Sequence, residues 1–92
     1  MKFLADEHWR YEVRATRRAE KDIQKLSPKL KEKFYSILME VIAVDPYQGK
    51  KLLGELEGSY SYRLTFQDRI VYSVDTKSKI VWIERAKTHY GE

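Results

Sequence analysis

The chain has 92 residues, with 18 lysines and arginines, 14 aspartates and glutamates and no cysteine. This length predicts a single domain over residues 1–92, and the absence of cysteine excludes disulfides, thiolate catalysis and cysteine-ligated zinc. No apolar run is long enough to span a membrane, and the first residues lack the apolar segment of a secretion signal, so we expect a cytoplasmic protein. The net charge of +4 permits a polyanionic partner without requiring one.

The first third of the chain predicts a strand and a short helix. Residues 1–10 form a possible N-terminal arm, whereas residues 11–15 alternate apolar and polar side chains as a half-buried strand does. Thr16 has the side chain of a helix N-cap. Apolar residues then follow at helical spacing, namely Ala19, Ile23 and Leu26.

A second helix is predicted to begin after Ser27. The Ser27 hydroxyl suits a helix cap and Pro28 suits the first helical position, while Asp45 precedes a proline and so avoids helical angles. The apolar stripe of this helix contains Leu30, Phe34, Ile37, Leu38, Val41 and Ile42. Because the break between the two helices is short, we expect a helical hairpin.

After Gly58 the hydrophobic period changes to that of strands, which are predicted at about residues 60–66, 70–75 and 80–83. A three-residue loop between the first two would pair Phe66 with Ile70 and keep the aromatic face intact. The order of elements predicts an α+β fold. It has an N-terminal strand, a two-helix hairpin and a three-stranded antiparallel meander, which together form a four-stranded sheet with the helices on one face.

Basic and aromatic side chains gather in the last third of the chain, at Arg63, Arg69, Arg85, Lys87, His89 and Tyr90. On a regular strand, residues 85, 87 and 89 point the same way. Arg63 has small polar neighbours, where a guanidinium suits a phosphate clamp, and a nearby histidine can move protons near neutral pH. Taken alone, each is more often a solvated surface residue, so this pattern predicts only a small basic domain able to bind a polyanion.

The sequence contains no phosphate loop, no glycine fingerprint, no spacing typical of a serine triad and no cluster of metal ligands. We therefore expect neither a cofactor nor a metal ion.

Three segments resemble a known family: residues 52–64, residues 68–74 and residues 88–90. They read LLGELEGSYSYRL, DRIVYSV and THY, and in this order they resemble the RelE/ParE superfamily of bacterial toxin–antitoxin toxins. The ending His89-Tyr90 is most similar to the YoeB/Txe branch. Similar residues in the first strand, in the first helix and at the end of the second extend the resemblance over most of the chain.

The resemblance implies a type II toxin that inhibits translation. Such toxins are ribosome-dependent, metal-free endoribonucleases that cut mRNA in the ribosomal A site, and a cognate antitoxin protein holds them inactive. The ribose 2′-hydroxyl attacks the adjacent phosphate and leaves a 2′,3′-cyclic phosphate. This chemistry needs a base, positive charge on the phosphorane and an acid for the leaving oxygen.

Matched position by position, the resemblance assigns catalytic roles to three residues. Arg69 matches the arginine that contacts the phosphate, His89 matches the proton donor, and Tyr90 matches the tyrosine that orients or stacks on the substrate. The basic residues expected to bind RNA or phosphate are Arg63, Lys50, Lys51, Arg85 and Lys87.

The general base is where this sequence departs from the YoeB/Txe branch. That branch has a glutamate in the connector between helix and sheet, and here the connector at residues 46–58 is shorter. Glu55 is the candidate base, and Glu57 is the other carboxylate nearby. Lys50 and Lys51 are an alternative, since lysines contribute in RelE-like members.

Two other functions stay open. The first is a ParE-like, non-enzymatic poison of DNA gyrase, because that group shares the fold and the strand that begins at Arg69. The second is an inactive member that only pairs with its antitoxin, which the missing aligned glutamate suggests. His89 favours the ribonuclease, because a binding module needs no proton donor.

Overall fold

A computed structural model describes residues 2–3, 10–54 and 57–88. The elements in chain order are β1 (Lys2–Phe3), β2 (Glu12–Ala15), α1 (Arg17–Gln24), α2 (Pro28–Ile37), a π-helical turn (Leu38–Ile42), a 3-10 turn (Pro46–Gln48), β3 (Lys50–Lys51), β4 (Ser59–Arg63), β5 (Arg69–Asp75) and β6 (Ile80–Thr88). Of the predicted N-terminal arm, residues 2–3 pair with β2, and residues 1 and 4–9 lie outside the described residues.

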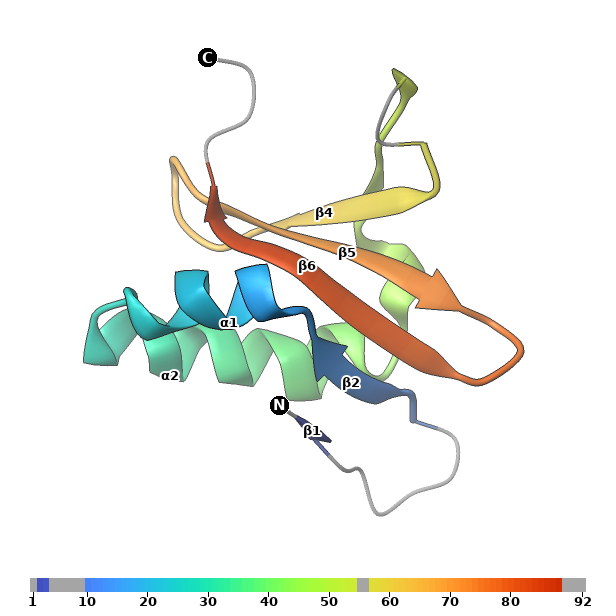
Figure 1. Ribbon diagram of the computed structural model, residues 1–92, viewed down its shortest axis with the longest axis horizontal. Coiled ribbons are helices and arrows are strands. Elements are labelled where there is room, and N and C mark those ends of the chain that lie inside the picture. The colour runs from blue at the N-terminus through green and yellow to red at the C-terminus, as the bar shows by residue number, and fades with distance from the viewer. Residues whose placement is uncertain (1, 4–9, 55–56, 89–92) are drawn as a thin grey trace.

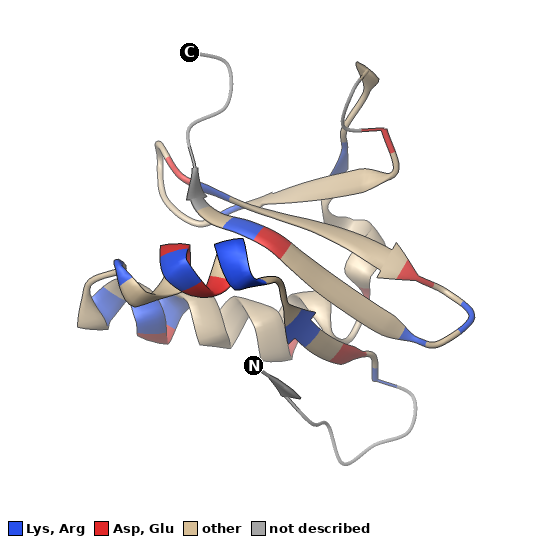
Figure 2. Cartoon of the chain, viewed as in Figure 1, with Lys and Arg blue, Asp and Glu red and all other residues tan. Residues whose placement is uncertain are grey.

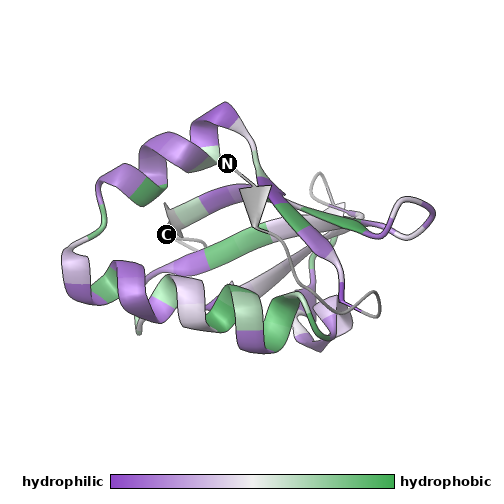
Figure 3. Cartoon of the chain, turned by 90° about the horizontal axis from the view of Figure 1, so that it is seen from below, coloured by the Kyte–Doolittle hydropathy of each residue, from purple (hydrophilic) through white to green (hydrophobic). Residues whose placement is uncertain are grey.

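Both helix starts are capped as the sequence predicts. The Thr16 hydroxyl accepts a hydrogen bond from the Ala19 amide at 3.1 Å, and the Ser27 hydroxyl accepts one from the Leu30 amide at 3.2 Å. The helices form the expected hairpin and open as a V against the sheet (Figure 3). Neither helix, in the part of the chain that the structure describes, is long and apolar enough to cross a membrane.

The hydrophobic core lies between the helix pair and one face of the sheet. The helical hairpin, including the link between its helices, and the turn after it contribute the buried residues Ala19, Ile23, Leu26, Phe34, Leu38 and Ile42. The strands contribute Val13, Ile70, Tyr72, Val81, Ile83 and Ala86. Figure 3 shows hydrophobic residues concentrated in the second half of α2 and in the turn that follows it.

The sheet has the strand order β1-β2-β6-β5-β4-β3 (Figure 1). The expected α+β fold and the antiparallel meander β4-β5-β6 are confirmed, but the prediction of a four-stranded sheet is wrong. Within the described residues, two dipeptide strands, β1 and β3, extend the sheet at its edges. The pairing of β2 with β6 is parallel, so the sheet is mixed.

The predicted pairing of Phe66 with Ile70 is also wrong. Tyr62 faces Ile70 and Arg63 faces Arg69, so β4 ends at Arg63 and residues 64–68 form the loop. The strand ends there because side-chain hydrogen bonds within the loop build a turn instead. As a result Phe66 is 90% exposed rather than part of the core face.

The connector between α2 and the sheet is fixed by Tyr72. Its buried hydroxyl donates to the Pro46 carbonyl at 2.7 Å, and burial raises the pKa of Tyr72. Gly49 passes so close that a Cβ there would lie 2.2 Å from the Tyr72 hydroxyl and 2.9 Å from the Ser61 carbonyl. Glycine is therefore required at position 49 by the close approach of the backbone to β4 and β5.

We expect Tyr72→Phe to lower the free energy of unfolding by about 1–3 kcal/mol, because the buried Pro46 carbonyl loses its donor. Tyr62→Phe is the matched control, since the half-buried Tyr62 hydroxyl has no hydrogen bond to a described residue. Urea unfolding followed by circular dichroism measures both variants. Equal stability of the two would contradict the assigned role of Tyr72.

Candidate functional site

Two arginines face each other across the β4–β5 hairpin. Arg63 and Arg69 are directly opposite, and residues in that relation present their side chains on the same face of a sheet. The alternate residues Tyr62 and Ile70 lie toward the helices, in the core or packed against it. Arg63, Arg69 and Ser61, which lies two residues before Arg63 on β4, therefore share the opposite face, which we call the outer face.

Arg69 is held in place on this outer face. It is half-buried, and its Nη1 donates a hydrogen bond to the Ser61 hydroxyl at 3.4 Å. Arg63 is exposed, and neither arginine forms an ion pair with a described residue. Like charges directly opposite on a hairpin repel each other, so this pair is a favourable place for an anion.

β6 runs to the same corner of the sheet. Thr88, the last described residue, is the partner of Arg69 on the side away from Arg63. Thr88 directly precedes His89 in the sequence. The predicted catalytic residues His89 and Tyr90, and the predicted base Glu55, lie outside the described residues, so their roles stay predictions.

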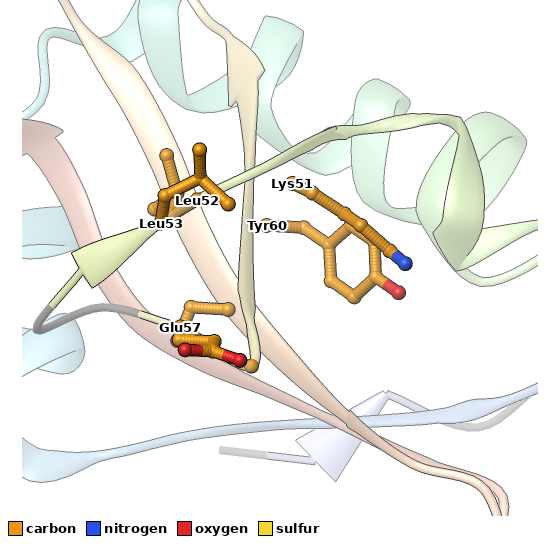
Figure 4. Close-up of a pocket in the computed structure, with 7 residues that line it drawn as sticks. Lys51, Leu52, Leu53, Glu57 and Tyr60 are labelled. Atoms are coloured by element: carbon orange, nitrogen blue, oxygen red, sulfur yellow. The ribbon is translucent and has the colours of Figure 1, made fainter.

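The two adjacent lysines of β3 point to opposite faces. Lys50 is the partner of Ser61 and therefore shares the outer face with Arg69, whereas Lys51 is the partner of Tyr60. Figure 4 shows the Lys51 side chain extending beside the Tyr60 ring. Only Lys50 of this predicted pair is brought to the side of the arginines.

Arg85 has a partner within the fold. Its Nε lies 2.7 Å from Asp22 Oδ2 and its Nη2 lies 3.5 Å from Asp22 Oδ1, which ties β6 to α1. The Ala86 amide donates to the same carboxylate at 3.0 Å. The predicted phosphate-binding role of Arg85 therefore competes with an ion pair whose side chains are only 28% and 14% exposed.

The expectation that residues 85, 87 and 89 share one face assumed a regular strand. β6 shifts register twice against β5, between the partners of Arg69 and Val71 and between those of Val71 and Tyr72. Each such bulge interrupts the alternation of faces. The direction of the Arg85 side chain therefore does not predict that of Lys87, whose side chain lies outside the described residues.

Sequence reasoning missed Glu84 as a feature of the outer face. The Ser59 hydroxyl donates to Glu84 Oε1 at 2.8 Å, so a half-buried carboxylate lies across from the start of β4. In the sequence, only the position of Glu84 directly after the apolar run 80–83 pointed to this residue. The bulge of β6 next to Glu84 cannot be predicted from the sequence.

A pocket in the described part of the chain lies away from the arginines. It has a volume of about 360 Å³ and is lined by Lys51, Leu52, Leu53, Glu57, Gly58, Ser59 and Tyr60 (Figure 4). Within the described residues, no group of three or more histidines, aspartates or glutamates is placed to hold a metal ion. Figure 2 shows charges of both signs along the two helices, whereas most of β4 and β5 carries neither.

We expect Asp22→Ala to lower the free energy of unfolding by about 2–3 kcal/mol, because it removes the acceptor of the Ala86 amide and leaves Arg85 without this partner. Asp22→Asn keeps an amide oxygen for Ala86 and loses the charge, so a smaller effect is expected. Gln24→Ala, at an exposed position of the same helix, is the control. Urea unfolding checks all three, and an Asp22→Ala variant as stable as Gln24→Ala would refute the assignment.

Comparison with solved structures places the fold among toxin–antitoxin proteins. A chain of the RelBE2 toxin–antitoxin complex from Mycobacterium tuberculosis is 31% identical, with 87% of this chain and 98% of that one covered at a TM-score of 0.78. A chain of the YoeB–YefM complex from Staphylococcus aureus is 27% identical over 88% and 99%, with a TM-score of 0.72. The YoeB/ParE toxin from Agrobacterium tumefaciens, 22% identical over 85% and 98% with a TM-score of 0.75, shares the fold. No protein-family model and no curated protein sequence matches the chain.

Proposed function

This chain belongs to the RelE/ParE superfamily of toxins, and we propose that it is the toxin of a type II toxin–antitoxin system that cleaves mRNA on the ribosome. One observation supports this proposal most directly. Arg69 is fixed by Ser61 on the outer face, opposite Arg63 and beside the end of β6. That arrangement suits a scissile phosphate at the point where the chain continues into His89.

The proposed reaction is an intramolecular transfer of the phosphoryl group. A base removes the proton of the ribose 2′-hydroxyl, the 2′-oxygen forms a bond to phosphorus, and the bond from phosphorus to the 5′-oxygen breaks. His89 gives its proton to that leaving oxygen, and Tyr90 stacks on or orients the substrate. The products are a 2′,3′-cyclic phosphate and a free 5′-hydroxyl.

Arg69 has the electrostatic role in this scheme. The phosphorane carries more negative charge than the starting phosphate, so a guanidinium held in position stabilises the transition state more than the substrate. The hydrogen bond that Arg69 donates to the Ser61 hydroxyl orients the guanidinium before the substrate binds. Arg63 is more exposed and is assigned to the neighbouring backbone phosphates.

Lys50 is the described residue best placed to assist at the phosphate from β3. It shares the outer face with Arg69 through its partner Ser61, and Gly49 and Tyr72 fix the backbone just before it. Glu55 remains the carboxylate candidate for the base. In this proposal Lys50 supplies charge or the base function in the manner of RelE-like lysines.

A cognate antitoxin protein is the proposed regulatory partner. Two of the similar structures are complexes of a toxin with an antitoxin. An antitoxin segment that folds on binding suits such a regulator. The proposed site of action is the cytoplasm, where ribosomes carry the mRNA substrate.

We expect Arg69→Ala to lower mRNA cleavage by about 10²–10³-fold, as the loss of a positioned transition-state donor does. His89→Gln is expected to lower it by about 10²-fold or more. Primer extension on mRNA from expressing cells measures both, with Arg18→Ala on the exposed side of α1 as the control. Growth arrest with intact transcripts, and cleavage complexes formed by purified gyrase, would favour the gyrase poison instead.

The strand register yields a matched pair of lysine variants. Lys50→Ala is expected to lower cleavage by about 10-fold or more, because a charge-assisted contact on the outer face is lost. Lys51→Ala, one residue away on the other face, is expected to lower it by less than about threefold. Purified ribosomes programmed with a defined mRNA provide the assay. A larger loss at Lys51 would show that the substrate lies on the wrong face for this proposal.

A further inference from the structure

Phe66 is the most exposed large apolar side chain in the described part of the chain. It is 90% exposed, at the middle of the loop that joins Arg63 to Arg69. The other three exposed large apolar residues, Val44, Tyr47 and Leu53, belong to the segment between α2 and β4. Phe66 is therefore a single aromatic ring between the polar residues Thr65 and Gln67, in a loop that has an arginine at each end.

The loop holds this ring in a fixed position. The Thr65 hydroxyl accepts hydrogen bonds from the amides of Gln67 at 3.1 Å and Asp68 at 2.9 Å, and it lies 3.1 Å from Asp68 Oδ2. The Asp68 carbonyl accepts from the amides of Leu64 at 2.9 Å and Thr65 at 3.1 Å. Leu64 is fully buried and anchors the loop in the core. The exposure of Phe66 is thus a property of an ordered turn.

A lone exposed phenylalanine is common enough on protein surfaces to need no explanation by itself. Here two further features accompany it, because the ring is presented by a hydrogen-bonded loop and the loop is flanked by a facing pair of arginines. An apolar protein partner favours a contiguous apolar patch, and no second exposed large apolar side chain occurs in this loop. A nucleotide offers the matching groups, a base with a π-face and a phosphate.

We propose that Phe66 stacks on a base of single-stranded RNA whose adjoining phosphate is bound by Arg63, next to the scissile phosphate at Arg69. This inference rests on the proposed function and adds a substrate contact outside the reacting bond. Stacking on an aromatic side chain tolerates every base because each has a π-face. Phe66 would therefore strengthen RNA binding and position the strand without selecting a sequence.

The test uses the full chain and two probes of equal length. One is a short 2′-O-methyl RNA, which resists cleavage because its attacking hydroxyl is blocked, and the other is an abasic oligomer with the same phosphates and no bases. Fluorescence anisotropy measures their binding to the parent chain and to Phe66→Ala, Phe66→Leu and Phe66→Trp. Leu53→Ala is the matched control, because Leu53 is 83% exposed and lies outside the β4–β5 loop. Unchanged thermal unfolding confirms that each variant folds.

Phe66→Ala and Phe66→Leu are expected to weaken binding of the RNA roughly 5- to 100-fold, and Phe66→Trp to retain it. Binding of the abasic oligomer should be the same in all variants. Equal RNA affinity of the parent and Phe66→Ala overturns the inference, and full binding by Phe66→Leu overturns stacking in favour of a general apolar contact. Loss of antitoxin binding instead of RNA binding in Phe66→Ala also overturns it.

Cleavage of ribosome-bound mRNA by the parent separates this inference from the proposed function. If the parent cleaves and Phe66→Ala binds and cleaves as well as the parent, only the stacking role fails. If the parent binds the RNA through Phe66 and never cleaves, the nuclease fails and the stacking contact stands. If the parent binds neither probe, the stacking role is wrong, and the nuclease is wrong as well only when ribosome-bound mRNA also stays intact.

Discussion

The carboxylate of Asp22 binds the part of β6 that extends beyond the end of β2. β2 pairs with β6 only as far as Ile83, so the later part of β6 would present an unpaired edge on that side. α1 takes the place of the missing strand there, because Asp22 accepts from the Ala86 amide and from Arg85. Buried backbone donors need such partners, and Asp22 supplies one to Ala86 beyond the end of the pairing with β2.

Thr16 supports the same edge from the start of α1. Its amide donates to the Ile83 carbonyl at 3.0 Å, while its hydroxyl caps the helix and lies 3.3 Å from the Glu84 carbonyl. One residue thus ends β2, begins α1 and contacts β6. The helix is joined to the strand at both of its ends, by Thr16 and by Asp22, so the bulged part of β6 has a fixed neighbour as it runs toward the Arg69 corner.

Local signals in the sequence predicted the helices well. Thr16, Ser27 and Pro28 each act through atoms within four residues, and such signals are readable without the fold. The same holds for the change of period after Gly58 and for the meander. Arg69 and Lys50 were proposed as site residues from the resemblance, and the register places them on one face.

The failed predictions depended on contacts that a periodic pattern does not contain. The pattern placed Phe66 in the core, and the hydrogen bonds between Thr65 and Asp68 ended the strand before it. The grouping of Arg85 with Lys87 and His89 assumed a regular strand. The bulges of β6 remove that assumption and Arg85 contacts Asp22, 63 residues away, so the shared face stays an untested prediction. Turn chemistry and long-range pairing decide these positions.

The place of β6 between β2 and β5 has a consequence for synthesis of the protein. Of the described strands, Ile80–Thr88 is the last to leave the ribosome, yet it lies in the interior of the sheet and contacts both halves of the chain. The nascent chain can form its helical hairpin early, but the sheet cannot close until residue 88 has emerged. A sheet connected in this way gains its central strand only after the strands on either side of it have been synthesised.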